Sequence, residues 1–177
     1  MGESSSSRAG GILLLIGRLG LAAIFLVAAY AKLKPQVPGP WTVGAVKTSL
    51  SMFAMQVDSY QLLSAASADF VAHTLPFFEL FLGLWLLSGI ALRLSSVAAA
   101  LLLGGFYATL IRTYAKGLEI NCGCFGPGER LTPKRLALEG LMIVLALGVA
   151  IGAYVMARRK TIPPESAAAS PEFQRAR

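Results

Sequence analysis

Four long apolar segments constrain the fold of this chain more than any other feature of its sequence. They cover residues 11–31, 75–92, 95–114 and 136–157, and each is close to the length that a helix needs to cross a bilayer core of about 30 Å. Charged residues make up only 14% of the chain, against about 25% in soluble domains, so a small water-soluble core could not bury this much apolar surface. The sequence therefore predicts an all-α integral membrane protein, a bundle of four transmembrane helices.

The first apolar segment has a second interpretation, as a cleaved signal peptide. Arg8 would supply the positive start of the signal, and residues 29–31, Ala-Tyr-Ala, fit the small residues of a cleavage site. Arg18 would interrupt the apolar region of such a signal, and the apolar run is long for one. We therefore favour a retained transmembrane helix.

Both ends of the chain differ in composition from the apolar segments. Residues 1–10 are small and polar, and residues 158–177 begin with a basic cluster and continue rich in Pro, Ser and Ala. Such segments cannot bury enough apolar surface to fold, so we expect disordered tails there. The membrane domain is then residues 11–157.

The longest connection, residues 32–74, lies between the first and second predicted spans. Its apolar residues recur at helical spacing over residues 43–57, which predicts an amphipathic helix at the membrane interface. This helix either lies on the membrane surface or packs on the end of the bundle, and the sequence favours neither. We expect a short helix over residues 59–73 to lead into the second span, with Pro76 in the first turn of that span.

The chain is basic, with a net charge of +7, and its basic residues mostly flank the apolar segments. That placement suits anionic lipid headgroups and not a nucleic-acid surface, so we expect membrane lipid as a partner and no nucleic acid. The densest charges next to span ends are Arg93 and the cluster at residues 158–160, which predicts cytoplasmic termini. The connection over residues 32–74 and the loop over residues 115–134 would then face an oxidising exterior.

The loop between the third and fourth spans contains the only two cysteines, Cys122 and Cys124, separated by Gly123. A disulfide between such close residues is strained and needs the backbone freedom of glycine, and a strained, exposed disulfide is easily reduced. Redox activity is therefore one interpretation. Binding of a soft metal together with a partner, a bond to another chain, and inert thiols are the others. His73 is the only histidine, which excludes a multi-histidine metal site.

Ionisable residues inside a membrane are costly and tend to pair within the bundle. Glu79 lies about one turn inside its span, at the same depth as Arg112, Lys32 and Tyr30 in the neighbouring spans. We predict that these four residues converge beneath the Cys122 loop and that Glu79 pairs with Arg112 or Lys32. The alternative is that the two basic side chains extend to lipid headgroups, which we favour for Lys32.

Two further expectations concern helix packing. Arg18, near the other end of the first span, should extend its long side chain to the nearer membrane surface. Gly83, Gly89, Gly104 and Gly105 should let neighbouring helices approach closely.

Several of these residues occur in an order that resembles a known group of membrane proteins. The segments that carry the resemblance are Tyr30-Ala31-Lys32-Leu33, Ser59-Tyr60-Gln61-Leu62-Leu63, Leu75-Pro76-Phe77-Phe78-Glu79-Leu80 with Gly83, and Asn121-Cys122-Gly123-Cys124-Phe125-Gly126. Over roughly residues 11–157 the chain is similar to the DoxX-like superfamily, and within it to the methylamine utilisation MauE family.

The resemblance implies a four-helix protein of the bacterial inner membrane. That family is associated with maturation of periplasmic methylamine dehydrogenase, a disulfide-rich enzyme, and often with a thioredoxin-like partner. Cys122 and Cys124 match the family's cysteine motif, and Glu79 matches its membrane carboxylate. The bundle also resembles membrane thiol oxidases that pass electrons to quinone, although those enzymes use two cysteine pairs and this chain has one.

These observations lead to two main hypotheses of function. In the first, Cys122 and Cys124 cycle between dithiol and disulfide, as in a thiol–disulfide oxidoreductase, and electrons pass to a thioredoxin-like protein or, as the second candidate, to quinone. In the second, the chain is a non-enzymatic membrane assembly factor that anchors a client, and the cysteines are structural. A soft-metal handling protein is a third and weaker interpretation, because only Met52 and Met55 form a close methionine pair.

Overall fold

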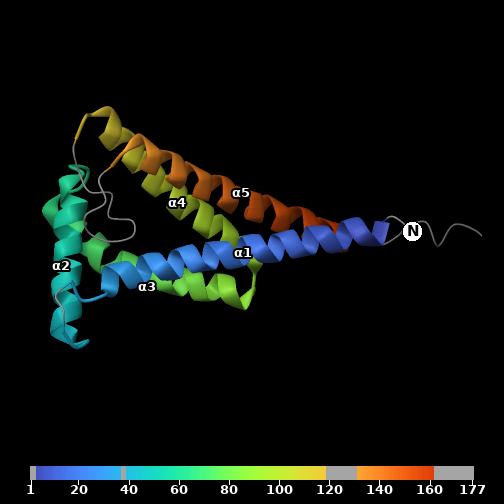
Figure 1. Ribbon diagram of the computed structural model, residues 1–177, viewed down its shortest axis with the longest axis horizontal. Helices are drawn as coiled ribbons and strands as arrows, with labels where there is room; N and C mark the ends of the chain where they lie inside the picture. Colours follow the sequence, from blue (N-terminus) through green and yellow to red (C-terminus); the bar gives the residue numbers. More distant parts are fainter. Residues whose placement is uncertain (1–2, 37–38, 119–130, 162–177) are drawn as a thin grey trace, which may run out of the picture.

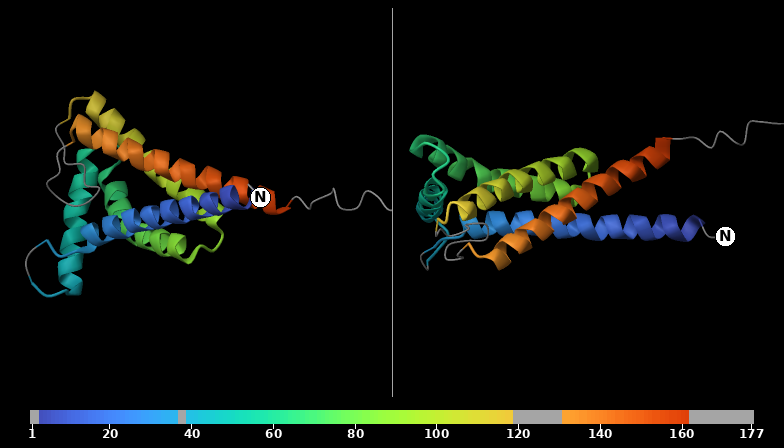
Figure 2. Two further views of the ribbon diagram at one scale, coloured as in Figure 1. Left: turned by 45° about the vertical axis from the view of Figure 1, so that its right-hand side comes forward. Right: turned by 90° about the horizontal axis from the view of Figure 1, so that it is seen from above.

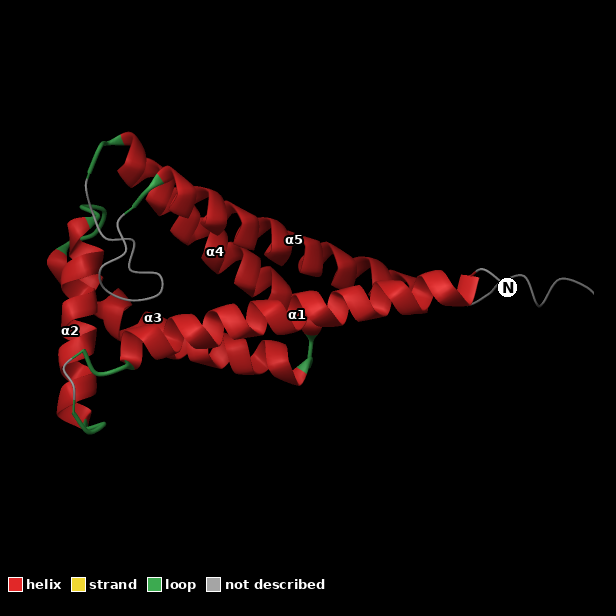
Figure 3. Ribbon diagram, in the orientation of Figure 1, coloured by secondary structure: helices red, strands yellow, loops and turns green. Residues whose placement is uncertain are grey.

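The computed structural model describes residues 3–36, 39–118 and 131–161, and the regular structure in these ranges is helical throughout (Figure 3). The helices are α1 (Glu3–Leu33), α2 (Val43–Ser59), α3 (Ala65–Ser88), α4 (Leu92–Ala115) and α5 (Pro133–Thr161). All except α2 are long and apolar enough to cross a membrane. The prediction of an all-α bundle with four spans and one shorter helix between the first two spans is confirmed.

The bounds of α3 differ from the predicted ones. The structure has one helix from Ala65 to Ser88, so residues 65–73 are helical as predicted, but they belong to the second span and not to a separate short helix. The Ser64 side chain caps the helix by accepting from the Ser67 amide at 3.4 Å. Pro76 lies inside the helix and not in its first turn. Transmembrane helices tolerate an internal proline because neighbouring groups satisfy the freed carbonyl.

The outer helices also extend beyond the predicted spans. Helix α1 begins at Glu3, within the segment expected to be a disordered tail, and α5 continues to Thr161. Adding residues to an existing helix is far easier than starting a new one, so a polar segment next to a long helix can continue it.

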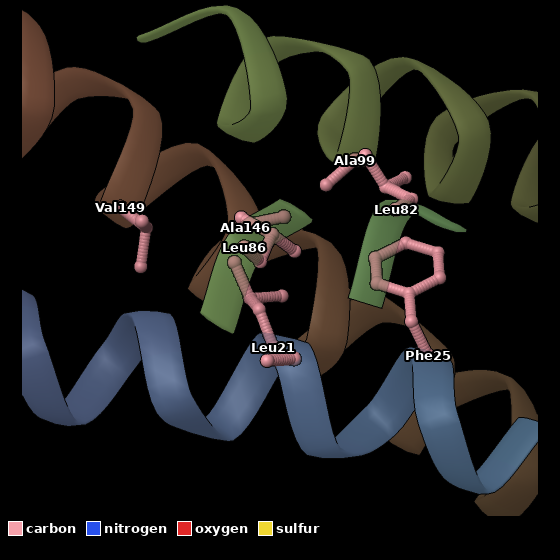
Figure 4. Close-up of a cluster of buried hydrophobic side chains, with 8 residues drawn as sticks. Leu21, Phe25, Leu82, Leu86, Ala99, Ala146 and Val149 are labelled. Carbon is pink, nitrogen blue, oxygen red and sulfur yellow. The ribbon is translucent and has the colours of Figure 1, made fainter. Parts of the chain in front are cut away.

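The four spans form two pairs that diverge toward α2. Helix α1 runs along α3 and α4 runs along α5, and the two pairs separate at the end where α2 lies, here called the α2 end (Figures 1 and 2). Near the opposite end all four spans contribute to one apolar core (Figure 4). Its fully or almost fully buried residues are Leu21, Ala22, Phe25, Leu82, Leu86, Ala99, Ala146 and Val149.

Glycines allow close helix approaches, at one of the predicted positions and at one that was not predicted. A Cβ on Gly83 would lie 2.9 Å from the Leu26 side chain, so Gly83 does set the spacing of α1 and α3. Gly17, which the sequence analysis did not single out, has the same role where α1 crosses α5, because a Cβ there would lie 2.7 Å from Val149. Gly104 and Gly105 have open space around them, so the prediction for these two residues is wrong.

Helix α2 packs across the end of the bundle, nearly perpendicular to the spans (Figure 1). It begins after Thr42, whose side chain accepts from the Ala45 amide at 3.1 Å. Leu50 and Phe53 are buried, and the Ser49 hydroxyl donates to the Lys34 carbonyl at 2.9 Å. Of the two arrangements that the sequence left open, the structure therefore has the helix packed on the bundle.

The side chain of Arg18 reaches the end of α3, which is also the end of the candidate membrane span of that helix. Its Nη2 donates to the Leu87 carbonyl at 3.4 Å, and its guanidinium lies against Gly89, which ends α3 in a left-handed conformation with φ of 70°. The last carbonyls of a helix lack partners within the helix and carry partial negative charge, which makes this position favourable for a cation.

We expect Gly89→Ala to lower the free energy of unfolding by about 1–2 kcal/mol, because the left-handed conformation is strained for a residue with a Cβ. The effect should be larger if Arg18 cannot move, since the added methyl group would meet its guanidinium. Thermal unfolding in detergent, followed by circular dichroism, measures the change. Gly104→Ala, inside a helix and with open space, is the control, and equal stability of the two variants would contradict this account.

Candidate functional site

A buried ion pair joins α1 to α3 near the α2 end. Lys32 Nζ lies 2.8 Å from both carboxylate oxygens of Glu79, and the two residues are only 5% and 8% exposed. The predicted pairing of Glu79 with Lys32 is confirmed. The favoured alternative for Lys32, extension to the headgroups, is wrong, because α2 covers this side chain and places the Phe53 ring 5.5 Å from Nζ.

The ion pair lines a cavity between the two diverging helix pairs. The cavity has a volume of about 290 Å³. Its walls are apolar except at Lys32, Glu79, Thr109 and Glu139. They are formed by Ile24, Phe25 and Ala28 of α1, Val71 and Leu75 of α3, Leu101, Leu102, Leu103, Gly105 and Phe106 of α4, and Met142 of α5.

A second cavity continues the first toward α2. Its volume is about 200 Å³, and it shares Val71, Leu75, Phe106 and Thr109 with the first cavity. Phe53 and Tyr60 line its α2 side. The two cavities therefore lie next to each other, one lined by the buried ion pair and the other by residues of α2.

Glu139 is a second buried carboxylate that the sequence analysis did not single out. It is only 4% exposed, lines the first cavity, and lies 3.5 Å from Arg135 Nε one turn earlier on α5. The argument that identified Glu79 applies equally to Glu139, because burying an acidic residue in an apolar span is costly at either position. The site therefore has two carboxylates, each close to a basic side chain.

Tyr60, just after α2, is the second residue that sequence reasoning missed. It is 5% exposed and its ring packs edge-on against Phe106 at 6.5 Å. Burial, with a smaller contribution from Glu139, raises the pKa of the Tyr60 hydroxyl. The hydroxyl therefore keeps its proton throughout the physiological pH range.

Tyr30 and Arg112, which were predicted to join Glu79, lie elsewhere. Tyr30 is 58% exposed and stacks on Trp41 at 6.0 Å. Residues two positions apart point in very different directions on a helix, so Tyr30 cannot face the site that Lys32 faces. Arg112 is exposed on α4, which diverges from α3 at this end of the bundle (Figure 1).

Cys122 and Cys124 lie outside the described residues, but both ends of their loop are placed. Leu118 follows the end of α4 and Leu131 precedes α5, at the α2 end. Leu131 packs against the buried pair of Tyr60 and Leu110. The loop therefore starts and finishes at the same end of the bundle as the ion pair and the cavities.

Within the part of the chain that is described, no three His, Cys, Asp or Glu side chains are close enough to hold a metal ion. His73 lies one turn after Asp69, and its Nδ1 is 2.9 Å from the Asp69 carbonyl oxygen and 3.4 Å from a carboxylate oxygen.

Comparison with known proteins identifies one family. The family described as "Methylamine utilisation protein MauE" matches residues 10–154, which is most of the chain. Neither the curated proteins nor the solved structures include a significant match. The matched range includes the first three spans, α2, the cysteine loop and most of the fourth span. The chain is therefore a multi-pass membrane protein that belongs to the MauE family, and this membership implies a role in methylamine utilisation.

Proposed function

We propose that this chain is a membrane thiol–disulfide protein that supports maturation of a periplasmic client enzyme, with Cys122 and Cys124 as its redox pair. The main support is the position of their loop, whose ends lie at the α2 end beside the buried ion pair and the cavities. In this arrangement both termini are cytoplasmic and the α2 end faces the periplasm, where disulfides persist.

The reaction proceeds through a mixed disulfide. A client thiolate attacks one sulfur of the Cys122–Cys124 disulfide, and the second client thiolate then releases the two cysteines as a dithiol. The client loses two electrons and two protons and the Cys-Gly-Cys pair gains them. A thioredoxin-like partner in its disulfide form restores the Cys122–Cys124 disulfide by the same exchange. The partner gains the two electrons and two protons and becomes a dithiol.

A quinone is the second candidate acceptor, because it accepts two electrons and two protons and dissolves in the membrane. The cavity is compatible with the head of such a molecule, since it is apolar, close to 300 Å³ and lined by groups that form hydrogen bonds. Here Lys32 and Glu79 would orient the head group. The soluble partner remains our first choice, because the chain has only two cysteines.

A non-enzymatic assembly factor is the alternative function, and α2 is the observation that favours it. This helix lies across the bundle and exposes Val43, Met52 and Met55, of which Val43 is 88% exposed. Flexible methionine side chains suit a surface that adapts to a client. In this case the cysteines would only stabilise the loop.

Cysteine trapping distinguishes the two functions. We expect Cys124→Ser, expressed in the native host, to accumulate a mixed disulfide with a periplasmic protein, seen as a reducible band on a nonreducing gel. The Cys122→Ser/Cys124→Ser variant is the control and should show no such band and no growth on methylamine. If this double variant supports growth like the parent, the redox function is wrong and the assembly function stands.

The orientation is tested on the same variants. Intact spheroplasts of Cys124→Ser are first treated with a membrane-impermeant reductant to release the mixed disulfide, and a membrane-impermeant maleimide should then label the remaining cysteine. Labelling only after the membrane is opened would place the loop in the cytoplasm and contradict the proposed compartment.

A further inference from the structure

The turn between α3 and α4 is recessed at the end of the bundle opposite α2. Helix α3 ends at Ser88 and α4 begins at Leu92, whereas α1 and α5 extend past this turn (Figures 1 and 2). A groove of about 490 Å³ lies there between α4, α5 and α1. Its lining is apolar except for Arg93, and consists of Leu14, Ala91, Leu92, Leu94, Ala153, Met156 and Ala157.

Two arginines meet at one aromatic ring beside this groove. The Arg93 guanidinium, from the start of α4, lies 5.3 Å from the centre of the Tyr154 ring on α5. The Arg158 guanidinium, one turn further along α5, lies 5.5 Å from the same ring. Cation–π attraction therefore places both guanidinium groups beside one ring at the edge of the groove, and this local positive charge favours binding of an anion there.

The position relative to the membrane indicates what kind of anion this is. The predicted span of α5 ends at Arg158 and that of α3 ends at Ser88, so the arginines lie where hydrocarbon gives way to headgroups. A small soluble anion would contact only the basic side chains and leave the apolar groove empty. An anion that carries an acyl chain would also fill the groove. None of the residues that line the groove is acidic.

We propose that this groove is a binding site for one anionic phospholipid. Its phosphate lies against Arg93, the basic residue of the groove, where a guanidinium group forms charge-assisted hydrogen bonds, and Arg158 adds positive charge nearby. One acyl chain follows the apolar wall between α4 and α5. The lipid fills the space that the short α3–α4 hairpin leaves uncovered. This site is at the opposite end of the bundle from the ion pair and does not depend on the redox function.

Lipid titration of the purified full chain in a neutral detergent tests the site. We expect dioleoylphosphatidylglycerol to raise the unfolding temperature and to remain bound in native mass spectra, and dioleoylphosphatidylcholine to do neither. Inorganic phosphate and glycerol phosphate test whether the headgroup alone is enough for binding. Neither should raise the unfolding temperature at the same concentration as the lipid.

Variants then locate the site. Arg93→Gln should weaken phosphatidylglycerol binding about tenfold, the expected effect of losing one charge-assisted contact. Tyr154→Leu, which keeps both arginines but removes the ring that holds them, should weaken it too. Lys116→Gln, with the same loss of charge at the other end of α4, is the matched control and should bind like the parent.

Two outcomes would overturn the proposal. One is an equal response to phosphatidylglycerol and phosphatidylcholine. The other is an Arg93→Gln variant that is folded by circular dichroism and responds like the parent. A full response to inorganic phosphate would show an anion site without a lipid chain, which also contradicts it.

Discussion

Removing either partner of the Lys32–Glu79 pair is expected to lower the free energy of unfolding by about 3–5 kcal/mol, the range for a buried pair that loses one member. Lys32→Met leaves the Glu79 carboxylate buried with no ammonium beside it. Glu79→Leu removes the carboxylate that faces the buried Lys32 ammonium beneath α2. Each variant removes the opposite charge from a buried ionised group, and the side chains around that group are mostly apolar.

The double variant Lys32→Met/Glu79→Leu should recover most of this loss, because replacing a whole buried pair with apolar residues of similar size is often neutral or stabilising. Unfolding of the parent, the two single variants and the double variant in detergent gives the coupling free energy between Lys32 and Glu79. A control cycle on Asp69 and His73, an exposed pair on α3, should give a coupling below about 1 kcal/mol.

The same variants separate a structural role from a functional one. If the double variant is stable but does not support growth on methylamine, the pair acts in the function of the site. If both single variants are as stable as the parent, the pair is not buried as described and the site must be revised.

Gly83→Leu is expected to have the second large effect, about 3 kcal/mol or more, because it overpacks the contact between α1 and α3. Its Cβ alone would lie 2.9 Å from Leu26 and 3.3 Å from the Ala22 carbonyl oxygen. The Leu26 side chain can rotate away, but the Ala22 carbonyl belongs to the backbone of α1. The helices must therefore separate, about one turn from the Lys32–Glu79 pair.

Gly104→Leu is the matched control, since Gly104 is also inside a transmembrane helix but has open space around it. It should change the free energy of unfolding by less than about 1 kcal/mol. Thermal unfolding in detergent and the amount of folded protein in the membrane measure both variants. Similar values for the two would mean that Gly83 does not set the helix spacing.

Much of the fold followed from the sequence, because span length and apolar composition depend on the thickness of the bilayer and not on tertiary contacts. The buried pairing of Glu79 followed in the same way from the cost of a charge in a membrane. The identity of the partner of Glu79 could not be predicted in this way. A lysine at position 32 looks the same in the sequence whether it extends to headgroups or is covered by another helix. Only the packing of α2 over Lys32 decides between these outcomes.

Three other features depended on packing in the same way. The sequence placed Pro76 in a first helical turn, but nothing in residues 65–75 ends a helix and α3 runs through them. Arg18 extends toward the end of its own span as its length allows, but helix packing decides that the end of α3 is its partner there. Glu139 can be recognised in the sequence as a single acidic residue in its span. That it lines a cavity could not be predicted, because the cavity exists only where the two helix pairs diverge.

The divergence of the two helix pairs also affects the bilayer around the protein. The four spans meet at one core near one end and separate toward α2, which lies across the wide end (Figure 1). In this view the spans have a wedge-shaped outline, so we expect the molecule to displace more lipid from the leaflet at the α2 end than from the other leaflet. Many copies in one membrane patch would expand that leaflet and bend the patch. We therefore expect the protein to gather where the leaflet at the α2 end is already on the convex side of a curved membrane.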